Sequence, residues 1–315
     1  MKPQELRQFY ERKWLPNVKI PFFFVFWAGF GWIAWHASTL WILVPCYVAM
    51  GYLQMSVATV GHECTHNVFF RRPLWNWIFG MGIFSTLIVP YTTYREDHLL
   101  HHRVNRTSRD TAAFTMGNRR FTDFLIFYLY IFAGVPLLLL SFLLIHPFTY
   151  LKGRKFWLHW AECAAHAVLY YVVFRWAYQY GVLGKALGVW LYPVLVFGVI
   201  NSMRFLGEHY GTTWNGGEIG GTRSIQSNRA NSFFWCNINY HIAHHVYPAV
   251  PWYHLPGLQE LLLPEIAREG GLVESSYTKV FLRALSAGPE TPDRANAMAR
   301  KTLAGTAALI PSLAE

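Results

Sequence analysis

Long apolar runs are the feature of this sequence that most limits its possible folds. A helix needs about 20 mostly apolar residues to cross a membrane. The 315-residue chain has runs of this kind near residues 17–36, 38–58, 121–147, 157–178 and 186–206. Charged residues make up only 14% of the chain and hydrophobic residues 53%, against about 25% charged in a typical soluble domain. The sequence therefore predicts an all-α integral membrane protein.

The basic residues set the expected orientation, because cytosolic flanks of membrane helices are enriched in Lys and Arg. The first run is preceded by Lys2, Arg7, Arg12, Lys13 and Lys19, whereas the connection at 36–38 has no basic residue. We therefore expect a cytosolic N-terminus and a cytosolic segment 61–120. The net charge of +10 then reflects loops beside anionic head groups rather than nucleic-acid binding, since the basic residues flank apolar runs.

The number of crossings follows from the same rule. Residues after 206 carry Arg223 and Arg229, so an even number of crossings should separate them from residue 102. Run 121–147 is expected to be re-entrant or interfacial, because Pro136 interrupts it and a basic segment follows it. The prediction is four transmembrane helices, at 17–36, 38–58, 157–178 and 186–206.

The rest of the chain is expected to be cytosolic. Residues 264–315 are more polar and are predicted to form a soluble C-terminal segment with a cytosolic C-terminus. No repeat or linker is visible, so residues 1–315 are predicted to form a single domain. A helical cap at the cytosolic ends of the spans would carry the functional residues.

The fourteen histidines are grouped rather than scattered. Most of them lie in "HECTH", "HLLHH" and "HIAHH", which contain His62, His66, His98, His101, His102, His241, His244 and His245. His209 stands apart in "RFLGEHYG". Spacings of three and four residues place side chains on one face of a helix. Each cluster can therefore direct its imidazoles at one point, on the side predicted to be cytosolic.

Each cluster alone has more than one interpretation. H-E-x-x-H is typical of zinc proteases, with Glu63 as the base, and either of the other clusters could be a helix with solvated histidines. A zinc protease needs only three protein ligands, which leaves most of these histidines unexplained. So many imidazoles exceed the coordination sphere of one ion, and imidazole suits iron as well as zinc. The joint pattern predicts two metal ions, and two irons could activate O₂ whereas two zincs could only hydrolyse.

Metal-bound histidines need acceptors for their second N–H group. The acidic residues beside the clusters are candidates for this role: Glu63, Glu96, Asp97, Asp110 and Glu208. The alternative for each of them is a solvated loop charge.

The stretches "HECTH", "REDHLLHHRVNR" and "NYHIAHHVYPAVPWYHLP" resemble the three histidine boxes of the membrane fatty acid desaturase superfamily, across roughly residues 50–260. The resemblance implies a non-haem di-iron centre, with the eight box histidines as ligands. It also implies O₂-dependent oxidation of an unactivated C–H bond in a lipid-like chain. Many members carry one more histidine before the last box, and His209 matches that place. The histidines outside the pattern, which are not expected to be ligands, are His36, His146, His159, His166 and His254.

The resemblance leaves the outcome of the oxidation open. The ending of the third box favours introduction of a C=C double bond into an acyl chain, while Glu63 stands where many acyl desaturases have Asp. A lipid, alkane or carotenoid hydroxylase with the same di-iron site is the alternative. A third hypothesis, from a different functional class, is a non-redox transporter or metal-binding membrane protein. It is disfavoured because no repeat is visible and only His166 among the histidines lies deep in a predicted span.

The chain has no haem-binding or iron–sulfur motif, and its four cysteines form no C-x-x-C pair. The electrons are therefore expected from a separate carrier of the ferredoxin or cytochrome b5 type. The membrane is expected to be a bacterial inner membrane or the endoplasmic reticulum.

Overall fold

The computed structural model describes residues 3–111 and 115–307. The chain is mostly helical and divides into two compact units, each made of separated parts of the sequence. Unit 1 comprises Met1–Glu11, Leu100–Ile131 and Ser202–Glu315, and unit 2 comprises Arg12–Leu99 and Phe132–Asn201.

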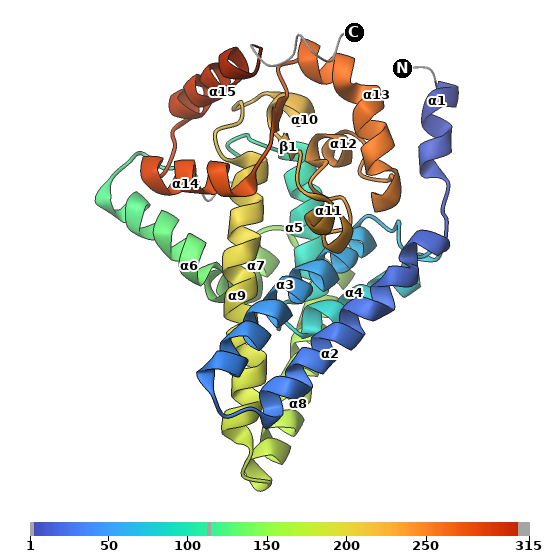
Figure 1. Cartoon of the computed structure of the whole chain (residues 1–315), viewed down its shortest axis with the longest axis vertical. Helices are drawn as coiled ribbons and strands as arrows, with labels where there is room; N and C mark the ends of the chain where they lie inside the picture. The colour runs from blue at the N-terminus through green and yellow to red at the C-terminus, as the bar shows by residue number, and fades with distance from the viewer. Residues whose placement is uncertain (1–2, 112–114, 308–315) are drawn as a thin grey trace. The chain divides into compact units, whose positions relative to one another are not determined.

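Unit 2 is built around long helices. They are α2 (Ile20–His36), α3 (Leu40–Thr65), α4 (Pro73–Ser85), the first part of α5 (Tyr91–Val104), the second part of α6 (Phe121–Leu144), α7 (His146–Tyr150), α8 (Arg154–Gln179) and most of α9 (Leu183–His209). A short 3₁₀ turn, η2 (Leu15–Lys19), leads into α2. Helices α2 and α3 form a hairpin, and α3 also packs against α4 (Figure 1). A Cβ atom at Gly51 would lie 2.6 Å from the Val196 side chain, so glycine permits the close approach of α3 and α9.

Large apolar side chains of unit 2 point outward, including those of Phe26, Trp32, Trp41, Val44 and Val172. Exposed apolar surface on this scale is compatible with lipid rather than with water. Among the described residues, three helices are long and apolar enough to span a membrane: Glu5–His36, Leu40–Thr65 and Leu183–His209. The chain is therefore a membrane protein, as its composition predicted.

The fourth predicted span is not established by the same criteria. Helix α8 coincides with the predicted run 157–178, but it is not among the helices that qualify. It carries the polar residues His159, Glu162 and His166, which lower its hydropathy. A bent pair, Phe121–Gly134 and Leu137–Tyr150, would be a fourth span only if it crosses as one element. The interruption expected near Pro136 is present, with non-helical backbone angles at Ala133. Whether this segment is re-entrant stays a prediction.

Unit 1 consists of shorter elements. They are α1 (Pro3–Arg7), η1 (Gln8–Tyr10), the end of α5, the first part of α6, the end of α9, α10 (Gly217–Gly220), β1 (Arg223–Ile225), α11 (Arg229–Phe234), α12 (His241–Val246), η3 (Trp252–His254), α13 (Leu255–Arg268), β2 (Leu272–Glu274), α14 (Tyr277–Ala287) and α15 (Pro292–Ala307). Strands β1 and β2 pair in parallel, with Arg223 opposite Leu272. This two-stranded sheet is the exception to the predicted all-α fold. Its strands have only three residues each, too few for an alternating pattern to be visible in the sequence.

The C-terminal segment is an integral part of unit 1. Ala284 of α14 belongs to a buried cluster with Phe127, Ile131, Leu206 and Tyr210, and Met298 of α15 packs against that cluster. Ser276 caps α14 by accepting a hydrogen bond from the backbone N–H of Lys279. The predicted soluble segment 264–315 is therefore docked on α6 and α9 as far as residue 307; residues 308–315 lie outside the described part of the chain.

Candidate metal sites

The first histidine box, "HECTH", lies at the end of α3, which continues to Thr65, beyond the predicted end of the span at residue 58, and His66 is the residue that follows the helix. Within unit 2, one nitrogen from each of His62, His66 and His98 lies within 4.8 Å of the other two. The Nε2 atoms of His66 and His98 are 2.9 Å apart, and the ring centroids of His62 and His98 are 4.4 Å apart. Unit 2 therefore brings box one and the first histidine of box two together.

Unit 1 contains the other five box histidines and His209. His101 and His102 come from the end of α5, His209 from the last residue of α9, and box three from the short helix α12. His102 Nε2 lies 3.2 Å from His244 Nε2, and His209 Nε2 lies 3.0 Å from His241 Nε2. One nitrogen each from His101, His209 and His245 also lies within 4.8 Å of the other two. Helix α5 carries histidines of both units: His98 belongs to unit 2, and His101 and His102, three and four residues later, belong to unit 1.

These distances fit shared metal ions. Two imidazole nitrogens that bind one ion at about 2.1 Å, at an angle between a right angle and a tetrahedral one, are about 3.0–3.4 Å apart. The closest pairs of unit 1, at 3.0 and 3.2 Å, lie in that range. Burial lowers the pKa of both His241 and His245 well below the ordinary value. Their imidazoles are therefore neutral, the form that binds metals.

The two ring nitrogens of His245 have different surroundings, which suit a candidate metal ligand. Its side chain is fully buried and its Nδ1 atom lies 2.8 Å from an Oε2 atom of Glu218. Its Nε2 atom is buried and has no hydrogen-bond partner within the described residues. A buried nitrogen without a partner is costly, and a metal ion at Nε2 would remove that cost. Histidines that bind metals in proteins commonly contact a carboxylate through one ring nitrogen and the metal through the other.

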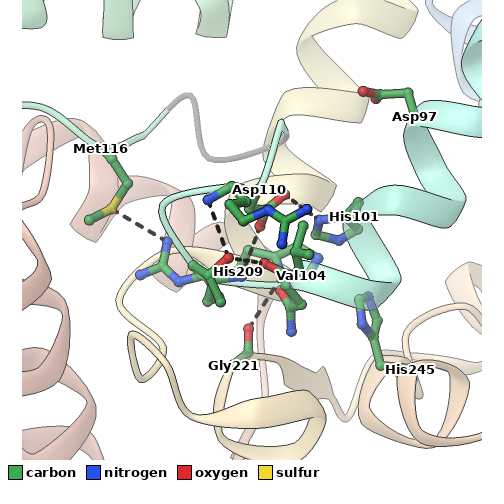
Figure 2. Close-up of polar contacts among 12 residues, drawn as sticks. Asp97, His101, Val104, Asp110, Met116, His209, Gly221 and His245 are labelled. Carbon is green, nitrogen blue, oxygen red and sulfur yellow. Dashed lines mark hydrogen bonds and ion pairs between the residues drawn. The ribbon is translucent and has the colours of Figure 1, made fainter. Parts of the chain in front are cut away.

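Asp110 holds His101 in the same manner. Its Oδ1 atom lies 2.9 Å from His101 Nδ1, and its Oδ2 atom accepts a hydrogen bond of 2.8 Å from the backbone N–H of Arg106 (Figure 2). The carboxylate thus fixes the ring of His101 and at the same time the chain that follows α5. Asp110 therefore contacts a ring nitrogen of a box histidine, and its role as the acceptor of a metal ligand stays a prediction.

Glu208 faces His241 across 3.5 Å, while Arg204 and the hydroxyl of Tyr277 also contact its carboxylate, at 3.0 and 3.2 Å. One nitrogen each from His209 and His241 and an oxygen of Glu208 lie within 4.8 Å of one another. Glu208 is therefore placed either to orient His241 or to bind a metal itself.

The other predicted acceptors are placed differently. Glu63 lies 4.0 Å from His62 Nδ1. Glu96 pairs with Arg95 at 2.9 Å and with Lys155 at 2.7 Å. Asp97 lies 3.3 Å from His146 and accepts a hydrogen bond from Tyr150. The two ion pairs of Glu96 indicate a structural role, which is neither the predicted acceptor role nor the solvated loop charge that the sequence left as the alternative.

Sequence reasoning missed Glu218. It lies in α10, 27 residues before His245, and burial raises its pKa to about 7. The only local signal is the glycine-rich setting "NGGEIGG", in which Gly217 adopts a φ of 67° that favours glycine. A turn of this kind does not by itself indicate a metal-ligand partner.

The histidines outside the boxes have other surroundings. His36 contacts the carbonyl of Trp32 and His254 that of Glu11. His159 contacts the hydroxyl of Thr93 at 2.7 Å. His166 is buried in α8. Among the described residues, none of these four histidines belongs to a cluster of three or more potential metal ligands.

The chain is similar to several known proteins. The family described as "Fatty acid desaturase" matches residues 38–277. An sn-1 oleoyl-lipid 12-desaturase from Arthrospira platensis is 27% identical over 264 residues, which cover 72% of this chain and 70% of that protein. A sphingolipid delta(4)-desaturase from Candida albicans is 25% identical, with 73% and 66% covered. An acyl-lipid omega-3 desaturase (cytochrome b5) of the endoplasmic reticulum from Arabidopsis thaliana is 38% identical over 64 residues, with 20% and 17% covered.

Proposed function

The chain belongs to the fatty acid desaturase family, and we propose that it introduces a C=C double bond into the acyl chain of a lipid, with O₂ as co-substrate and two histidine-bound irons. Membership of the family makes it an oxidoreductase that acts on a lipid. The match of residues 38–277 includes all the box histidines and His209. The observation that carries the proposal is the convergence of buried imidazoles, some of them backed by carboxylates, in a chain of this family.

The proposed ligands fall into two sets. By position in the chain, His62, His66 and His98 belong to unit 2, and the other six, His101, His102, His209, His241, His244 and His245, belong to unit 1. When bound, the two irons would supply the redox chemistry that allows O₂ to oxidise an unactivated C–H bond. Imidazole ligands suit iron as well as zinc, so the assignment of iron is supported by the family match rather than by the type of ligand.

The protein would contribute orientation and exclusion of water. Asp110 holds the Nδ1 side of His101, and Glu218 holds that of His245, at 2.9 and 2.8 Å. Each carboxylate would keep the second nitrogen of its histidine available to a metal and raise the basicity of that nitrogen. His241, His244 and His245 are all buried. Bulk water would therefore be kept from an oxidising site, as such chemistry requires.

The two electrons would come from a separate protein of the cytochrome b5 or ferredoxin type. The name of the Arabidopsis relative includes cytochrome b5, which supports an electron carrier of that kind. We further propose that the histidines and both termini lie on the cytosolic side. This orientation rests on the basic residues that precede α2.

The experiment is a comparison of lipids from cells that express the wild-type chain, His244→Ala or His254→Ala. The wild type should yield lipids that have lost two hydrogens, detected by mass spectrometry. His244→Ala should abolish this product while the protein stays in the membrane. His254→Ala is the matched control, because it alters a histidine in the same stretch that contacts the Glu11 carbonyl rather than the cluster. A product that has gained one oxygen would instead identify a hydroxylase, and unchanged lipids would contradict the proposal.

A further inference from the structure

We propose that unit 2 binds an anionic phospholipid in a groove beside the start of α2, which none of the proposed metal ligands lines. The groove, here called the N-terminal groove, has a volume of about 740 Å³, within the range of small-molecule sites. Its lining residues include five aromatic ones: Trp14, Phe24, Phe69, Phe70 and Phe79. Three basic residues, Arg12, Lys13 and Arg71, also line it.

The apolar wall is organised before any ligand binds. The rings of Phe69 and Phe79 stack with centroids 5.4 Å apart and planes 1° from parallel. Phe24 meets Phe79 edge-on at 6.3 Å. Aromatic pairs in these arrangements stabilise one another beyond their buried area. An acyl chain placed against them would need little rearrangement of the protein.

The backbone behind this wall is also fixed. Asn76 is fully buried, and its side chain both donates to the carbonyl of Phe70, at 2.7 Å, and accepts from the N–H of Phe70, at 2.9 Å. Arg12 donates to the carbonyls of Phe70 and Asn67, at 2.8 and 2.9 Å. The segment before α2 is thereby joined to the loop that follows α3.

The charge of the groove is of one sign. Lys13 and Arg71 are exposed at its rim beside Arg12, and no aspartate or glutamate is among its described lining residues. A ligand that fits must combine an apolar chain with a negative group, which is the chemistry of an anionic phospholipid. A zwitterionic lipid carries a positive group that this rim would repel.

The position of the groove agrees with this occupant. It adjoins the first turn of α2, which begins at Ile20, and the loop that follows α3, which ends at Thr65. The segments that contain these two helices, Glu5–His36 and Leu40–Thr65, qualify as membrane spans. The groove therefore lies where spans end and basic residues gather, the setting in which anionic head groups of the cytosolic leaflet are bound.

The test uses native mass spectrometry of the full-length protein in detergent, titrated with dioleoyl phosphatidylglycerol or dioleoyl phosphatidylcholine. We expect preferential binding of phosphatidylglycerol. The variant Lys13→Gln/Arg71→Gln should bind it about thirty-fold more weakly, if each basic side chain contributes about 1 kcal/mol. Arg12 is left intact because it also holds the loop. The matched control is Lys152→Gln/Arg154→Gln, which removes two exposed charges of the same unit outside the groove, and it should bind like the wild type.

Several results would overturn the proposal. Equal binding of both lipids, or equal binding by the wild type and Lys13→Gln/Arg71→Gln, would mean that the groove has no head-group preference. An equal loss in the control pair would assign the effect to net charge. Binding of glycerol 3-phosphate as tight as that of phosphatidylglycerol would show that the aromatic wall contributes nothing. Thermal unfolding of each variant verifies that it is folded, and none of these readouts requires enzymatic activity.

Discussion

The carboxylate of Glu218 accepts a hydrogen bond from Nδ1 of His245 across 2.8 Å, although 27 residues separate the two in the chain. The glutamate comes from the glycine-rich turn at α10, and the histidine from box three in α12. This contact joins the third histidine box to a residue that no box motif contains. It makes Glu218 a positioning residue of the proposed metal centre.

Glu218→Gln should weaken metal binding without unfolding the protein. The amide retains an acceptor oxygen but loses the negative charge that strengthens His245 as a ligand, and loss of such a partner typically lowers metal affinity 10–100-fold. The measurement is the iron that remains bound after titration with a chelator. Glu269→Gln, at an exposed site, is the control and should retain iron like the wild type. Equal retention by Glu218→Gln would remove this residue from the centre.

Glu290→Ala should strongly destabilise unit 1. Glu290 is fully buried and pairs with the buried Arg106 at 2.7 Å, and it also accepts hydrogen bonds from Thr115 and from the N–H of Gly211. Removing one partner of a buried ion pair leaves an uncompensated charge, at a cost of about 3–5 kcal/mol in the free energy of unfolding. Chemical denaturation in detergent measures this loss.

The control for that measurement is Glu265→Ala, which breaks an exposed pair with Arg268. It should leave the unfolding midpoint unchanged, because exposed pairs contribute little. Similar effects of the two substitutions would contradict the assignment of the Arg106–Glu290 pair as a main connection of the C-terminal segment.

Glu274 should make unit 1 sensitive to acid. Burial alone would raise the pKa of this carboxyl, but Arg283 at 2.6 Å and Arg223 at 2.9 Å outweigh it and hold the pKa below the ordinary 4.5. A lowered pKa in the folded state means that the contribution to stability is complete above pH 4.5 and is lost as the pH falls through the folded value. Glu274→Gln should therefore lower the Tm at pH 7, and the difference from the wild type should shrink as the pH falls below about 4.5. A difference that does not depend on pH would show that the charge of Glu274 is not involved.

The sequence was informative where a property repeats at a regular interval. Apolar runs predicted the positions of α2, α3 and α9, and histidine spacings of three and four agree with the helical conformation of α5 and α12. The break within 121–147 followed from Pro136, since proline removes a backbone donor from a helix. Each of these signals depends only on neighbouring residues.

What could not be predicted depends on contacts between distant segments. Glu218 reaches His245 because α10 packs directly against α12, although the two helices are separated in the chain by β1 and α11. Glu96 sits next to box two in the chain, yet its carboxylate pairs with Lys155, 59 residues away. The sequence shows which acidic residues are close to a histidine along the chain. Only the fold shows which of them contact its imidazole ring.

The metal content of the full-length protein tests the central proposal most directly. Protein purified after expression with ample iron should contain about two irons per chain by elemental mass spectrometry, and His244→Ala should contain less. His254→Ala should match the wild type. A single zinc per chain, with no iron bound, would contradict a two-iron oxidation centre and return "HECTH" to its alternative interpretation as a hydrolytic site.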